Sequence, residues 1–156
     1  MWLFVSSTLH AHTPSVEKWV HHVSLGYQYR TLVSEENFTS PHCSVLQYGA
    51  VFSLSENSNL NAFIEPSLSI VGLNQSVIQP SASMVLGFQL GQFFKIGSGP
   101  TVATRDDQDN TFFPQILVEA SFLLHIDQST IPIKFGYVPT SHGLTQYQLI
   151  LGYTWN

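Results

Sequence analysis

The chain has 156 residues, of which 44% are hydrophobic, 13% are aromatic and only 10% are charged, and its formal net charge is −5. Soluble domains carry roughly 25% charged residues, so this composition is poorly suited to an ordinary soluble surface. The acidic balance argues against nucleic acid as a partner, because phosphate binding needs a basic face. No uninterrupted apolar run reaches the roughly 18 residues of a membrane-spanning helix, so we expect no such helix.

The N-terminal segment 1–20 differs in pattern from the rest of the chain. It begins with a short apolar stretch, MWLFV, and reaches Leu9-His10-Ala11, which is typical of a cleavage site, but no basic residues precede the apolar stretch. We interpret 1–20 as a leader remnant or an N-terminal tail, and 21–156 as one folded domain.

Alternation of apolar and polar residues with period two predicts β-strands throughout 21–156. The first four expected strands cover about 21–33, 43–54, 60–71 and 82–90. Pro66 interrupts the third of these, which predicts a bulge or a weakly paired position there.

The same alternation continues in the second half, where the expected strands cover about 93–102, 115–126, 131–139 and 146–156. The last strand ends the chain with apolar residues on one face: Tyr147, Leu149, Leu151, Tyr153 and Trp155.

The connections between these strands alternate in length. Long connections cover about 34–42, 72–81, 103–114 and 139–145, and short ones cover 55–59, 91–92 and 127–130. Outer-membrane barrels show this alternation, with tight turns at one rim and larger loops at the other. The sequence therefore predicts an all-β fold, an eight-stranded antiparallel up-and-down transmembrane β-barrel.

Charged residues within the expected strands all fall on the polar face. They are Arg30, Glu65, Lys95, Glu119 and Lys134. An eight-stranded lumen is just wide enough for side chains to fill, whereas a charge on the lipid side at mid-depth costs about 2–4 kcal/mol. We therefore expect a polar network of these five residues that occludes the lumen. A gated narrow pore and a carboxylate pair with acid/base chemistry are the functional alternatives, and a soluble lipocalin-like ligand-binding barrel would reverse the two faces.

The alternating apolar residues of 146–156, closing on an aromatic, resemble the C-terminal assembly signal of bacterial outer-membrane proteins, although Asn156 follows the last aromatic. The resemblance implies insertion into the bacterial outer membrane by the barrel-assembly machinery. Tyr147, Tyr153 and Trp155 would then lie at the lipid interface, in contact with outer-membrane lipid and lipopolysaccharide. A retained segment 1–20 would lie in the periplasm.

The segment GLTQYQLILGYTW, 143–155, is similar to the final strand of the outer-membrane lipid A deacylase family. That similarity implies an acyl ester hydrolase, but the family's His-x-Ser-Asn motif is absent from 131–143, so its catalytic residues cannot be assigned. Ser141 and His142 in the last long loop are the remaining catalytic candidates, with acidic residues nearby in 103–114.

Metal and cofactor sites are not expected. Cys43 is the only cysteine, and the histidine pair His21-His22 has no acidic or thiol partner at a ligand spacing. We interpret the protein as a small outer-membrane barrel with an occluded lumen and a structural or surface-interaction role through its outer loops, whose partner the sequence does not specify. A lipid A deacylase-like enzyme, active or degenerate, and a soluble lipocalin-like barrel are the alternatives.

Overall fold

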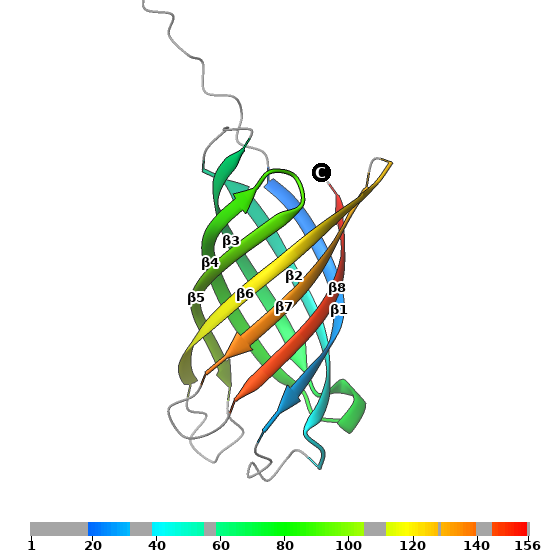
Figure 1. Ribbon diagram of the computed structural model, residues 1–156. Helices are drawn as coiled ribbons and strands as arrows, with labels where there is room; N and C mark the ends of the chain where they lie inside the picture. The colour runs from blue at the N-terminus through cyan, green and yellow to red at the C-terminus, as the bar shows by residue number, and fades with distance from the viewer. Residues whose placement is uncertain are drawn as a thin grey trace, which may run out of the picture.

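A computed structural model describes residues 19–31, 39–54, 59–104, 112–127, 129–139 and 145–155. Within these residues, eight antiparallel strands close into a single barrel in sequence order, with β8 beside β1 (Figure 1). The strands are β1 (Trp19–Arg30), β2 (His42–Ser53), β3 (Leu60–Val71), β4 (Gln79–Leu90), β5 (Phe94–Thr104), β6 (Phe112–Ile126), β7 (Ser129–Val138) and β8 (Gln146–Trp155). The fold class predicted from the alternation is confirmed. The leader interpretation of 1–20 concerns residues that lie almost wholly outside the described part and stays a prediction.

The observed strands extend beyond the expected ones at several ends. β4 begins at Gln79 and β6 at Phe112, each three residues earlier than the alternation predicts. Pairing with a neighbouring strand explains both extensions, because Gln79 pairs with Val71 and Phe112 pairs with Thr104. Alternation in one strand does not report this pairing.

Pro66 lies within β3 and does not create a bulge. The β2–β3 register is the same on both sides of it, with Gly49 opposite Ser67 and Phe52 opposite Ile64. The ladder is interrupted between these pairs, whereas Pro66 does pair with Met84 on β4. Since proline has no N–H to donate, the expectation of a weakly paired position is confirmed and the alternative of a bulge is wrong.

The two rims of the barrel differ, and they are named here by their connections. The turn end carries the C-terminus and the tight connections 54–59, 91–93 and 127–128. This rim is at the top in Figure 1. The loop end carries the longer connections and the 3₁₀ helix η1 (Leu73–Gln75). None of the helical structure in the described ranges is long and apolar enough to cross a bilayer.

Most apolar side chains of the strands face outward, whereas the charged side chains and a smaller group of buried apolar ones face the lumen. Leu25 is 65% exposed and Leu68 is 63% exposed, whereas Glu65 is only 3% exposed. The outward arrangement of hydrocarbon is that of a membrane barrel and the opposite of a soluble lipocalin-like barrel. A closed sheet also leaves no edge whose unpaired backbone groups would meet lipid.

Candidate functional site

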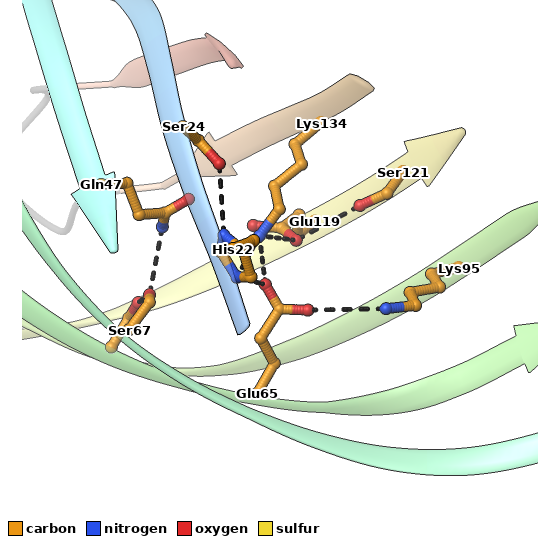
Figure 2. A network of polar contacts seen from close by, with 10 residues as sticks. His22, Ser24, Gln47, Glu65, Ser67, Lys95, Glu119, Ser121 and Lys134 are labelled. Atoms are coloured by element: carbon orange, nitrogen blue, oxygen red, sulfur yellow. Dashed lines mark hydrogen bonds and ion pairs between the residues drawn. The ribbon is translucent and has the colours of Figure 1, made fainter. Parts of the chain in front are cut away.

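Ionisable side chains from five strands converge at one level of the lumen (Figure 2). We call this group the charged cluster, and its members are His22, Glu65, Lys95, Glu119 and Lys134. Each occupies an inward-facing position of its strand, and at most 11% of any of these side chains is exposed to solvent. The alternation turns each of these side chains inward, and closure of the barrel then brings together residues more than one hundred positions apart, such as His22 and Lys134.

Lys134 lies at the centre of the charged cluster. Its ammonium group forms an ion pair with Glu65 and lies 3.6 Å from an oxygen of Glu119. On the far side of Glu65, the Lys95 ammonium lies 4.0 Å from the second carboxylate oxygen. The two carboxylates are thus matched by two ammonium groups, which is the condition under which buried charges are tolerated.

His22 completes the cluster through its contacts with Glu65 and Ser24, and its Nε2 lies 3.4 Å from the Lys134 ammonium. Because a carboxylate can only accept, we assign the tautomer in which His22 Nε2–H donates to Glu65 Oε1 at 3.0 Å. Its Nδ1 then accepts from the Ser24 hydroxyl at 3.2 Å. The opposite residue is Gly49, and a Cβ there would lie 2.5 Å from His22 Nε2. The imidazole therefore needs a glycine across from it.

Sequence reasoning missed His22 as part of this network. The signal was present, because His22 shares its strand face with Ser24 and Arg30, as period two requires. Taken by itself, the pair His21-His22 suggests only a metal site. Within the described residues, no group of three or more potential metal ligands of the His, Cys, Asp and Glu types comes together.

Arg30, the fifth residue of the expected network, lies apart from the charged cluster. It is at the loop end of β1, where its Nη2 donates to the side-chain oxygen of Gln79. Around it are the carboxamides of Gln28, Gln146 and Gln148, with N–O distances of 3.0 and 3.1 Å between their side chains. Alternation fixed the face on which Arg30 lies but not its depth in the lumen.

A small cavity of about 20 Å³ lies in the loop-end half of the lumen. Uncharged polar side chains line much of it, including Gln28, Gln47, Ser69, Gln115 and Gln148. A cavity needs roughly 10–15 Å³ to hold one water molecule, so this space is far too small for a sugar or a lipid.

The hydrogen bonds that link Ser24, His22 and Glu65 follow the serine–histidine–acid order of a hydrolase catalytic triad. The Ser24 residue is only 1% exposed, so a substrate carbonyl cannot approach its hydroxyl. Glu65 is also engaged by Lys134 and Lys95 rather than by the imidazole alone. This arrangement is suited to structural pairing across the lumen and not to acyl transfer.

The remaining predicted positions divide into two groups. Ser141, His142 and the acidic residues of 105–109 lie outside the described residues, so the catalytic hypothesis that involves them stays a prediction. Tyr147, Tyr153 and Trp155 face outward and are between 40% and 53% exposed. Trp155 stacks on His21 of β1 with 6.0 Å between ring centroids, where the last strand meets the first.

No family model matches the sequence, and no curated protein matches it. Among solved structures, the chain is similar to a de novo designed transmembrane β-barrel, with 12% identity, coverage of 87% of this chain and 95% of that chain, and a TM-score of 0.52. At this identity the similarity concerns the fold alone, and it supports a transmembrane barrel.

The outer-membrane protein Ail of Yersinia pestis is a weaker match. Its structure in a phospholipid nanodisc has 11% identity, coverage of 88% of this chain and 100% of that chain, and a TM-score of 0.45. The crystal structure of Ail with the heparin analogue sucrose octasulfate has 10% identity, coverage of 88% and 97%, and a TM-score of 0.46. Both TM-scores lie below 0.5, so these matches carry no argument about function, and the similarity of 143–155 to the deacylase family stays a prediction.

Proposed function

We propose that this protein is a small bacterial outer-membrane barrel that does not conduct, and that it acts structurally or through its outer loops. The observation that carries the proposal is Lys134, whose ammonium group bridges Glu65 and Glu119 within the lumen. A polar pore would need a continuous path of water past this point, and that path would separate the paired charges.

The packing around the charged cluster supports the same conclusion. Val51, Phe63, Val85, Leu117 and Val138 form a buried apolar group inside the barrel. The Lys95 ammonium lies 5.2 Å from the centre of the Phe63 ring. Apolar side chains next to the ion pairs leave little polar surface for a column of water.

Conductance across a planar bilayer tests whether the lumen is sealed. The refolded protein should insert without producing stable unitary current steps, while a porin in the same bilayer gives them. The double variant Glu65→Ala/Lys134→Ala removes the bridge. It should therefore conduct ions and produce current steps that the unmodified protein does not. Steady current steps from the unmodified protein would contradict the proposal.

The location and sidedness of the barrel need a separate experiment. We expect the protein to fractionate with outer membranes, to require the barrel-assembly machinery for insertion, and to expose the loop end. An epitope inserted within 105–111 should be labelled on intact bacteria, whereas the same epitope within 55–58 should be labelled only after lysis. Labelling of 55–58 on intact cells would reverse the proposed orientation.

A further inference from the structure

Backbone pairing between neighbouring strands is interrupted at three places within the residues that the structure describes. Each place lacks two successive residue pairs and contains a proline: Pro66 between β2 and β3, Pro100 between β4 and β5, and Pro132 between β7 and β8. On its other side, each of these prolines is paired normally with the next strand. We call the three places the proline seams.

The missing N–H of proline explains the seam between β2 and β3. Near the loop end of this pairing, the backbone N–H of Gly72 donates to the carbonyl of Ser44. Hydrogen-bonded and non-hydrogen-bonded pairs alternate along an antiparallel ladder, and Ala50 lies an even number of residues from Ser44. The position of Ala50 and Pro66 is therefore a hydrogen-bonded one, but proline has no N–H to donate to the carbonyl of Ala50.

The other two seams have the same pattern. The strand registers on both sides of each interruption place Met84 opposite Pro100 and Gly152 opposite Pro132. A backbone carbonyl without a donor finds no water in the hydrocarbon region, so such positions are unfavourable in a membrane. The strands are held by fewer backbone hydrogen bonds at the seams than elsewhere, and we expect the wall to separate most readily there.

Two of the seams lie against the charged cluster. Glu65 precedes Pro66 and belongs to the β2–β3 seam itself, because its pair with Val51 is one of those missing. The ion pair that Glu65 forms with Lys134 reaches across the lumen to β7, where Lys134 follows closely after Pro132. One ion pair thus connects the two strands that carry the prolines of these seams.

A chain of hydrogen bonds connects the same two seams through β1. Glu65 accepts from His22 at 3.0 Å, and His22 Nδ1 accepts from the Ser24 hydroxyl at 3.2 Å. Ser24 lies against Gly152 of the β7–β8 seam, since a Cβ on that glycine would be 2.5 Å from Ser24 Oγ. The polar groups of the lumen therefore join one seam to the other by two routes, through Lys134 and through His22.

The seam between β4 and β5 is closed differently. Its two missing pairs are Met84–Pro100 and Val85–Gly99. Val85 is 2% exposed and belongs to the buried apolar group inside the barrel. None of the ion pairs among the described residues is formed by these four residues. Apolar packing closes this seam, so it serves as a reference for the other two.

We propose that the ion pair of Glu65 and Lys134 clamps the β2–β3 and β7–β8 seams, so that the barrel wall loosens at these two places when the pair separates. The inference rests on the proposed function only in requiring that the barrel spans a membrane. It goes beyond a sealed lumen, because it specifies where the wall opens and assigns the seam at Pro100 no part in that opening.

Amide hydrogen exchange of the protein in lipid nanodiscs, followed residue by residue by NMR, tests the clamp. The readouts are the amides of Ala50, Met84 and Gly152, which face the three prolines. Lys134→Met should speed exchange at Ala50 and Gly152 by at least about tenfold and at Met84 by less than about twofold, because a broken buried ion pair is strongly destabilising where it acts. Equal acceleration at all three amides, or at none, would overturn the proposal.

A second variant separates the clamp from a general loss of stability. Lys134→Met combined with Glu65→Gln removes one charge of each sign, so it leaves no uncompensated carboxylate but still lacks the ion pair. Exchange at Ala50 and Gly152 should stay fast in this variant, which also carries the test if Lys134→Met alone does not fold. Exchange at the rates of the unmodified protein would show that the pair does not hold the seams.

Restoring the backbone donor at one seam is the matched control. Pro66→Ala supplies an N–H opposite Ala50, so in the background of Lys134→Met it should slow exchange at Ala50 and leave Gly152 fast. Pro100→Ala makes the same change at the reference seam and should leave both amides fast. The proposal fails if Pro66→Ala has no effect at Ala50. Heat-modifiable gel migration reports the folding of each variant and bilayer conductance reports the sealed lumen, so failure of this inference is distinguishable from failure of the proposed function.

Discussion

The two halves of the lumen are built from different chemistry. Towards the turn end and mid-depth, the charged cluster holds Glu65, Glu119, Lys95, Lys134 and His22 in contact. Towards the loop end, uncharged carboxamides and hydroxyls surround the small cavity, with the buried Arg30 beside them. Paired charges depend on every partner being present, whereas neutral hydrogen-bonding groups can be replaced in pairs at little cost. The same fold thus contains one region whose charged side chains are sensitive to single substitutions, and another whose paired neutral side chains tolerate replacement.

Removal of the central cation should have the largest effect. Lys134→Met leaves Glu65 and Glu119 buried with one fewer ammonium group to compensate them, and breaking a buried ion pair costs about 3–5 kcal/mol. We expect the free energy of unfolding to fall by this amount, measured by urea titration of the protein in lipid vesicles.

The control for that variant is Lys134→Met combined with Glu65→Gln, which removes one charge of each sign. This double variant should recover a large part of the lost stability, and the double-mutant cycle gives the coupling between the two residues. A cost below about 1 kcal/mol for Lys134→Met alone would mean that the pair behaves like an exposed one, and the contrast between the two halves would be lost.

Two inward-facing glycines allow the halves to be compared by the same substitution. In Gly49→Ala the new Cβ would lie 2.5 Å from His22 Nε2, so the imidazole must leave its position beside Glu65. Forced repacking of this kind costs about 1–3 kcal/mol. In Gly136→Ala the nearest atom is an oxygen of Gln148 at 3.1 Å, so a small shift suffices.

The measurement for both glycine variants is again unfolding in vesicles. Gly49→Ala should be the less stable of the two, and its loss should shrink when His22 is also replaced by alanine, because the clash disappears. If Gly136→Ala proves equally destabilising, the loop-end half is packed as tightly as the charged cluster.

The smallest effect is expected in the loop-end half. Ser69 and Ser81 are paired across β3 and β4, with 2.6 Å between their hydroxyl oxygens. Replacing both by alanine removes donor and acceptor together, so the unfolding free energy should change by less than about 1 kcal/mol. A larger loss would show that the hydroxyls of this region are as strongly coupled as the charges.

Much of this architecture could be predicted from sequence because period two assigns every strand residue to a face. That rule identified the eight strands and the inward side of Glu65, Lys95, Glu119 and Lys134. It could not predict depth, since depth depends on the stagger between neighbouring strands, and so it grouped Arg30 with residues from which the structure separates it.

The alternation within single strands also could not predict features that depend on three or more strands. The place of His22 in the charged cluster requires Gly49 opposite it and Glu65 two strands away. Each local sequence is compatible with several such arrangements, and only the register selects one.

The central claim is that the apolar face meets lipid while the other face is closed to water, and a spin-label scan of β8 tests it most directly. With Cys43 replaced by alanine, a single cysteine is introduced in turn at Leu149, Ile150 and Leu151. A nitroxide is attached to each cysteine, and each labelled protein is studied in a bilayer. Collision with oxygen should be frequent at Leu149 and Leu151 and rare at Ile150, which is 1% exposed, and a water-soluble nickel complex should reach none of the three. High nickel accessibility at Leu149 and Leu151 would contradict the account.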